Sequence, residues 1–77
     1  MRIHLSQQAM QVYRNPDTPS ELRQAIQALR VNQKPEWARR TSERPNRYEF
    51  PIGGYWILYE IDNSGSETVI KVEVIEE

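Results

Sequence analysis

Apolar and polar side chains alternate over residues 1–5, a period of two that is typical of a short β-strand. Ser6 follows at the position of a helix N-cap, where its hydroxyl can accept a backbone N–H. The next apolar residues recur at the spacing of one helix face: Ala9, Met10 and Tyr13. Pro16 disfavours helical geometry at Asn15, so the pattern predicts a short helix that ends there.

A second helix is predicted from a capping motif and a longer apolar stripe. Thr18 is the expected N-cap, Pro19 the first helical residue and Glu21 the partner that completes a capping box. The stripe has helical spacing and comprises Leu22, Ala25, Ile26 and Leu29. We expect this helix to stop between residues 31 and 34, so that the two helices form a hairpin.

Residues 36–46 are polar and basic, with Pro45 near their end. The pattern predicts a loop with room for one helical turn. Trp37 is the only large apolar side chain in this stretch. Its indole could anchor the loop on the core, or it could offer a stacking surface to a nucleic-acid base.

The second half of the chain predicts three strands, over residues 47–52, 55–61 and 67–75. Gly53-Gly54 suits the left-handed backbone of a tight hairpin turn, and residues 62–66 form a second turn cluster. Pro51 has no amide hydrogen and belongs on an edge or at a bulge. In the last strand one face is apolar, and it consists of Ile70, Val72 and Val74.

The predicted order is β-α-α-β-β-β in one domain over residues 1–77. Such a chain gives an α+β fold in which a helical hairpin packs on one face of a small, mostly antiparallel sheet. The side chains of Tyr55, Ile57, Tyr59 and Ile61 share one face of the middle strand, whereas Trp56 and Leu58 share the other. Helices on one face alone would leave apolar side chains exposed on the other, so we expect a homodimer or a complex with a partner protein there.

Composition narrows the chemistry. The 77 residues include no cysteine and one histidine, which excludes disulfides, thiolate metal sites and a cysteine nucleophile. We therefore expect no metal and no cofactor. No apolar run approaches the roughly 20 residues of a membrane span, and no signal-peptide core opens the sequence, so a soluble cytoplasmic protein is expected.

The net charge of −1 hides an asymmetry along the chain. Nine basic and four acidic residues lie in residues 1–47, and one basic and seven acidic residues follow. The basic residues singled out as a binding loop are Arg39, Arg40, Arg44 and Arg47. They could contact an acidic segment of a partner protein, bind nucleic acid together with Trp37 or Trp56, or pair with the acidic strands.

The stretch Gly53-Gly54-Tyr55-Trp56-Ile57-Leu58-Tyr59-Glu60-Ile61 resembles a strand of the RelE/ParE toxin superfamily. The resemblance extends over roughly residues 1–75, since the Leu5-Ser6 strand end, the helical hairpin and the final Val/Ile-rich strand also fit. It implies a toxin of a type II toxin–antitoxin pair that an antitoxin protein holds inactive. RelE-like members cleave mRNA in the ribosome, and ParE-like members act on DNA gyrase.

The match departs from the ribonucleases at two places. In RelE-like enzymes an arginine follows the first tyrosine of this strand, and here Trp56 stands there. Those enzymes also carry basic residues beyond the last strand, whereas residues 74–77 here read Val-Ile-Glu-Glu. RNA cleavage needs an acid, a base and cations for the phosphorane charge. We therefore expect a toxin-fold protein that acts by binding rather than by mRNA cleavage, with a non-toxic interaction or nucleic-acid-binding module as the alternative.

Overall fold

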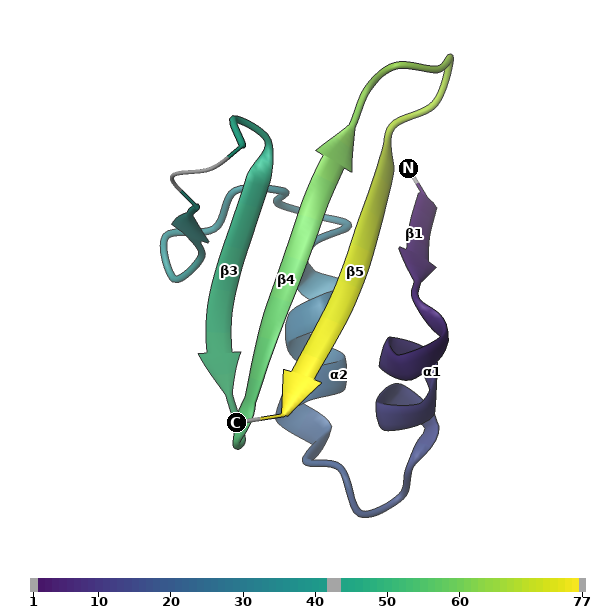
Figure 1. Ribbon diagram of the computed structural model, residues 1–77, viewed down its shortest axis with the longest axis vertical. Coiled ribbons are helices and arrows are strands. Elements are labelled where there is room, and N and C mark those ends of the chain that lie inside the picture. Colours follow the sequence, from purple (N-terminus) through teal and green to yellow (C-terminus); the bar gives the residue numbers. More distant parts are fainter. Residues whose placement is uncertain (1, 42–43, 77) are drawn as a thin grey trace.

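The computed structural model describes residues 2–41 and 44–76; residues 1, 42, 43 and 77 of the predicted domain, two of them in the basic loop, lie outside this range. The elements are β1 (Arg2–Leu5), α1 (Gln7–Arg14), α2 (Ser20–Ala28), β2 (Arg39–Arg40), β3 (Arg47–Ile52), β4 (Tyr55–Asp62) and β5 (Val69–Glu76) (Figure 1). The sheet order is β1-β5-β4-β3-β2. Only the β1–β5 pair is parallel. The predicted α+β class and the β-α-α-β-β-β order are confirmed.

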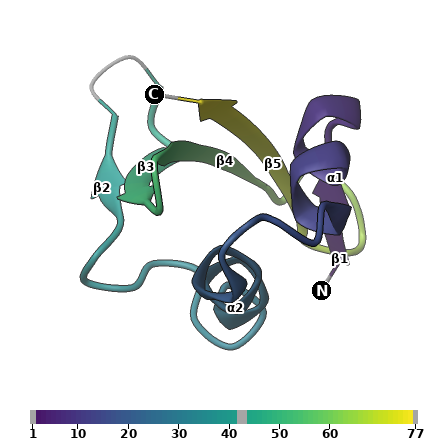
Figure 2. The ribbon, with the colours of Figure 1, turned by 90° about the horizontal axis from the view of Figure 1, so that it is seen from below.

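The first helix begins and ends as predicted. Ser6 caps α1, and its Oγ accepts a hydrogen bond from the Ala9 N–H at 3.1 Å. Asn15 is the C-cap, directly before Pro16. In Figure 2, α1 lies at the β1–β5 edge of the sheet. Ala9, in the first turn of α1, is fully buried there.

The predicted capping box of the second helix is wrong. Pro19 is the N-cap of α2 and no side chain caps it. Thr18 is buried, and its hydroxyl donates instead to the Val12 carbonyl at 2.7 Å, which ties the link between the helices back to α1. The bond to Val12 turns the Thr18 side chain toward α1, and Pro19 rather than Thr18 takes the N-cap position of α2. The helix also ends at Ala28, earlier than predicted, with Leu29 as its C-cap.

The core lies between α2 and one face of the sheet, which we call the helix-covered face (Figure 2). The predicted stripe of α2 supplies Leu22, Ile26 and Leu29, all fully buried. The sheet supplies every second residue of its long strands, and the buried ones are Phe50, Ile57, Tyr59, Ile61, Ile70, Val72 and Val74. The predicted assignment of residues to the two faces of β4 and β5 is therefore confirmed.

Gly53 and Gly54 form the predicted turn between β3 and β4. Their φ angles are +58° and +85°, in the left-handed region that the two central residues of a type I′ turn require. A Cβ on Gly53 would also lie 3.0 Å from Cγ of Pro19. The turn fixes the register, which pairs Ile52 with Tyr55 and Pro51 with Trp56.

The stretch predicted as a loop contains a strand. Arg39 and Arg40 form β2 and pair with Glu49 and Tyr48 of β3 in antiparallel register. Two residues are too few to show a period in the sequence, and arginine is no strong β-former, so neighbouring β3 imposes this strand. Pro51 lies further along β3, beyond the residues that pair with β2, as its missing N–H requires.

Candidate functional site

The face of the sheet opposite α2, which we call the open face, carries the predicted site residues. Trp56, Leu58, Glu60 and Asp62 of β4 point to it. In Figure 2 α2 lies on the other side of the sheet, and α1 borders the open face at its β5 edge, where Gln7, Gln8 and Gln11 line a hollow with Glu73 and Ile75. Cross-strand pairing places a second set of residues beside them, namely Arg39, Arg47, Glu49, Pro51, Val69, Lys71, Glu73 and Ile75. This face therefore combines charged and apolar side chains, in contrast to the apolar helix-covered face.

Ion pairs join the predicted basic residues to the acidic strands. Arg39 Nη2 lies 2.9 Å from Glu49 Oε1, Arg44 Nη1 lies 3.4 Å from Glu60 Oε1, and Arg47 Nη2 lies 3.8 Å from Glu73 Oε2. A fourth pair joins Lys71 Nζ to Asp62 Oδ2 at 3.1 Å. Pairs this exposed contribute little stability, about 0.2–1 kcal/mol each. The three arginine pairs bring basic residues of the first half of the chain next to acidic residues of the second half. This is the interpretation in which the arginines pair with the acidic strands.

An apolar row lies on the open face at the end near the β3–β4 turn. It consists of Pro51, Trp56 and Ile75, one from each of three adjacent strands. Ile75 is 49% exposed, and Pro51 is also exposed. The Arg39 guanidinium lies 5.9 Å from the centre of the Trp56 ring, a cation–π distance. We call these three residues the apolar row.

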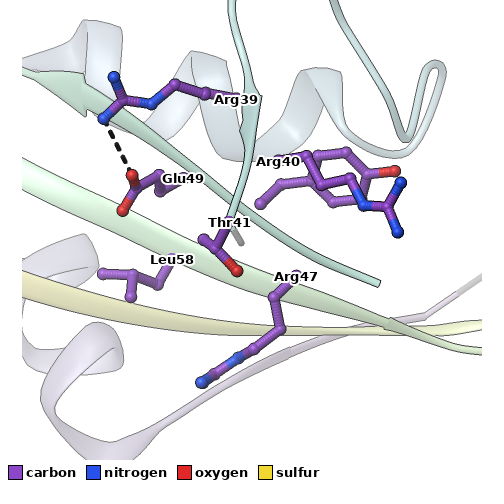
Figure 3. Close-up of a pocket in the computed structure, with 7 residues that line it drawn as sticks. Arg39, Arg40, Thr41, Arg47, Glu49 and Leu58 are labelled. Atoms are coloured by element: carbon purple, nitrogen blue, oxygen red, sulfur yellow. Dashed lines mark hydrogen bonds and ion pairs between the residues drawn. The ribbon is translucent and has the colours of Figure 1, made fainter. Parts of the chain in front are cut away.

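A basic pocket lies where β2 and the start of β3 meet (Figure 3). Its volume is about 410 Å³, and its lining residues are Arg39, Arg40, Thr41, Arg47, Tyr48, Glu49 and Leu58. Three of the four predicted arginines thus line one pocket, although their guanidinium groups do not converge. Arg39 and Arg40 point in opposite directions in Figure 3, because neighbouring residues of a strand face opposite sides of the sheet.

Arg44 does not belong to this pocket. It lines a separate hollow with Glu60 and residues 61–64 of the β4–β5 turn. The predicted basic loop is therefore divided between two places, and Trp56 meets it in the cation–π contact with Arg39. Sequence reasoning missed Thr41, Tyr48 and Glu49 as lining residues, since the β2–β3 pairing that brings them together leaves no periodic signal.

Trp37 is 48% exposed and packs edge-on against the buried Phe50, with ring centres 4.6 Å apart at 78°. With Ala25, Pro51 and Ile52 it borders an apolar crevice of about 270 Å³ between α2 and β3. This contact with the core agrees with the predicted anchoring role. Trp37 is not among the residues that line the basic pocket.

Among the described residues, two titratable groups have shifted pKa values, and neither is placed as a catalytic acid or base. Burial, and secondarily the nearby Tyr48, raises the pKa of Tyr59 well above its ordinary value. The Tyr59 hydroxyl donates to the Gln33 carbonyl at 2.7 Å and is turned to the helix-covered face. Hydrogen bonds from Ser64, and then the neighbouring Lys71, lower the pKa of Asp62 to about 2. Within residues 2–41 and 44–76 no cluster of three or more potential metal ligands occurs.

Comparison with protein-family models, with curated proteins and with solved structures finds no match to this chain. In the described part of the chain no helix is both long and apolar enough to cross a membrane. The site is therefore interpreted from its own geometry and from the sequence resemblance alone.

Proposed function

We propose that this chain is a RelE/ParE-like toxin-fold protein that acts by binding a protein partner through its open face. The observation that carries the proposal is the apolar row of Pro51, Trp56 and Ile75 on a sheet face that no described helix covers. Apolar side chains gathered on an exposed sheet face are typical of a protein interface. The element order and the central β4 strand are those that the resemblance implies, which supports the choice of family.

The chemistry around Trp56 favours binding over RNA cleavage. Glu49 and Glu60, the carboxylates nearest to it along β3 and β4, are held in ion pairs with arginines. Tyr59 faces the core, and burial raises its pKa, so its hydroxyl keeps its proton. Among the described residues of the open face we find no cation beside Trp56 apart from Arg39, which already pairs with Glu49. Such an arrangement lacks the acid, base and free cations that phosphodiester cleavage needs.

The open face also indicates what kind of partner it fits. The apolar row would receive apolar side chains, and the ion pairs beside it present both signs of charge at the rim. An antitoxin-like protein segment with an apolar stripe and flanking charges matches this pattern. A second copy of the chain would match the apolar row as well, and the predicted homodimer remains a proposal on the same ground.

The first test is growth of a bacterial host on induction of the parent chain, of Trp56→Ala and of Val31→Ala. Val31 is 92% exposed in the loop after α2, so its substitution controls for loss of an exposed apolar side chain elsewhere. Arrest by the parent and Val31→Ala but not by Trp56→Ala would support the proposal. Arrest by all three would exclude the apolar row, and normal growth with all three would exclude an active toxin and leave the non-toxic interaction module.

The second test measures the molar mass of the parent and of Trp56→Ala in solution. A dimer that becomes a monomer in Trp56→Ala would place self-association on the open face. An unchanged mass would restrict that face to a different partner. Circular dichroism of both proteins would show that the substitution leaves the fold intact.

Nucleic-acid binding is the alternative that the basic pocket favours, because three arginines are among the residues that line it. Its signature is an affinity that falls steeply with salt, since each phosphate contact releases counterions. Fluorescence anisotropy with a labelled single-stranded oligonucleotide at two salt concentrations would decide it. No binding at the lower salt concentration would exclude this alternative.

A further inference from the structure

The edge strand β1 turns unpaired backbone groups away from the sheet. β1 stands at one end of the strand order, beside β5. The N–H groups of Arg2 and Ser6 donate to carbonyl groups on the β5 side, both at 3.0 Å. Because neighbouring residues of a strand turn their backbone groups to opposite sides, the N–H and C=O groups of Ile3 and Leu5 point to the other, free side of β1.

The free side of β1 is open to another strand. Within residues 2–41 and 44–76, no backbone hydrogen bond from outside the sheet reaches Ile3 or Leu5. In Figure 1 β1 is the outermost strand, and α1 follows beyond its end rather than along its free side. A row of unpaired N–H and C=O groups at a sheet edge is a template for pairing with another chain.

The opposite edge of the sheet offers less to a pairing strand. β2 has two residues, and the Thr41 N–H that follows them donates to the Arg47 carbonyl of β3 at 2.9 Å. By the same alternation Arg39 also faces β3, so Arg40 is the residue of β2 that turns its backbone groups outward. Further along β3, Pro51 has no N–H to donate. Backbone pairing with another strand is therefore favoured at β1.

We propose that the free side of β1 pairs with β1 of a second copy of this chain, in antiparallel register centred on His4. Ile3 then lies opposite Leu5 of the second copy, and Leu5 lies opposite Ile3. Each of these two pairs exchanges two N–H···O=C bonds, which satisfies every outward backbone group of the two residues in both copies. A second copy fits because this arrangement is its own complement about a two-fold axis at His4.

The side chains of β1 agree with this register. Ile3 and Leu5 are half-buried and pack against the core. Their pairing with Ile70 and Val72 places them on the helix-covered face, so the contact between Ile3 and Leu5 of the second copy extends the apolar layer from one copy to the other. Arg2 is exposed on the open face and lies opposite Ser6 of the second copy, so the two arginines do not oppose each other.

The contact at β1 does not depend on the proposed function, because it leaves the apolar row free. A two-fold axis perpendicular to the sheet joins the five strands of each copy into one continuous sheet, with both open faces on the same side. A partner with two matching segments could then bind both open faces at once. Trp56→Ala should leave this dimer intact, whereas self-association through the open face would be lost in the same protein.

The first test follows molar mass and amide exchange of the parent chain at concentrations from about 10 µM to 1 mM, because one short strand from each copy makes a small contact of low affinity. The mass should rise toward that of a dimer, and the Ile3 and Leu5 amides should exchange more slowly at the higher concentration. The Ser6 amide is the control and should change far less, since it already bonds to the Val72 carbonyl. A monomer throughout, or exchange of Ile3 and Leu5 that does not depend on concentration, would overturn the proposal.

A cross-link tests the register, since the chain has no cysteine of its own. Directly opposed residues of this kind have Cα atoms about 4.5 Å apart, within the range of a disulfide, so His4→Cys should form a covalent dimer on mild oxidation. The matched control Arg2→Cys lies on the same face of β1, but its two copies are four residues out of step, about 13 Å apart, and it should stay monomeric on a non-reducing gel.

Two outcomes of the cross-linking experiment would overturn the proposal. Equal cross-linking of His4→Cys and Arg2→Cys would show random collision rather than a register. No cross-link in His4→Cys, at a concentration at which the parent is a dimer, would exclude pairing at His4. If Trp56→Ala is then monomeric, self-association belongs to the open face instead.

Discussion

The two faces of β4 carry opposite kinds of side chain on one backbone. Tyr55, Ile57, Tyr59 and Ile61 meet α2 and the core, and the last three are almost fully buried. Trp56, Leu58, Glu60 and Asp62 alternate with them on the open face, and all four are only half-buried. The first set is apolar throughout apart from tyrosine hydroxyls, whereas the second begins with an aromatic ring and ends with two carboxylates.

The difference teaches what each face contributes. The helix-covered face supplies burial of apolar surface, the main favourable contribution to folding, and it is continuous from α2 to β5. The open face supplies exposed ion pairs of small energy and one apolar row. Under the proposed function, stability comes from one face of the sheet and partner binding from the other, and substitutions on the two faces should have separate effects.

The largest effect is expected from a pair of substitutions on the two faces of β4. Ile57→Ala removes a fully buried side chain and should lower the free energy of unfolding by about 3 kcal/mol. Leu58→Ala, on the half-buried open face, should cost about 1 kcal/mol or less. Urea unfolding of both variants measures the difference. Equal losses of unfolding free energy in the two variants would mean that the open face contributes to stability as much as the core does, and would contradict the distinction between the two faces.

The next largest effect is expected at the Gly53-Gly54 turn, which sets the register of β3 and β4 and thereby decides which side chains lie on each face. Gly53→Ala places a side chain at a φ of +58° and 3.0 Å from Pro19 Cγ, which should cost about 1–2 kcal/mol. Gly65→Ala has open space and serves as control. A slip of one residue in this hairpin would exchange the two faces of β3, so amide exchange of β3 and β4 should be followed beside the unfolding curve. A loss for Gly65→Ala equal to that for Gly53→Ala would contradict the argument.

A smaller effect follows from the Tyr59 hydroxyl. Tyr59→Phe removes the bond to the Gln33 carbonyl and should cost about 1 kcal/mol. Because the folded-state pKa of Tyr59 is raised, its contribution to stability is complete below the ordinary tyrosine pKa of about 10 and is lost as pH rises above it. Thermal melts of the parent and Tyr59→Phe between pH 8 and 11 test this, with the parent alone expected to lose stability from this group.

The smallest effect lies on the open face. Asp62 should titrate near pH 2 in a carbon-13 spectrum, and Ser64→Ala should raise its pKa because the substitution removes the hydrogen bond that the Ser64 hydroxyl donates to the carboxylate, while the bond from the backbone N–H of residue 64 stays. Since the folded pKa is lowered, its contribution to stability is present above the ordinary aspartate pKa of about 4 and is lost as pH falls toward 2. A Ser64→Ala protein with the parent pKa would show that the hydroxyl does not lower it, and would leave the backbone N–H of residue 64 and Lys71 as the causes.

Much of the fold was predictable because its signals are local. The alternation in β4 and β5, the stripe Leu22–Leu29 of α2, the Ser6 cap and the Gly53-Gly54 turn each arise from residues close together in the sequence. The prediction that Thr18 caps α2 was wrong because tertiary contacts decide the role of this side chain. Its hydroxyl donates to the Val12 carbonyl of the preceding helix and does not cap the helix that follows. Strand β2 was missed because β3, not its own two arginines, determines it.

The candidate site was predicted less well than the fold. Four arginines were grouped because they are near in sequence, yet Arg44 lies apart and Arg47 reaches across β4 to Glu73 of β5. The unpartnered Thr41 hydroxyl carries no sequence signal at all, since it depends on where the β2–β3 connection places it. Long-range pairing of this kind is decided by the packed sheet and not by any window of the sequence.

The position of β5 has a consequence for synthesis of the chain. β5 comes after every other element in sequence but lies inside the sheet, between β4 and β1. As the ribosome extends the chain from its N-terminal side, β1 has no strand to pair with until residues 69–76 have been made. The sheet can therefore close only after translation has passed β5, and a nascent chain that lacks this strand has neither an assembled open face nor a complete core.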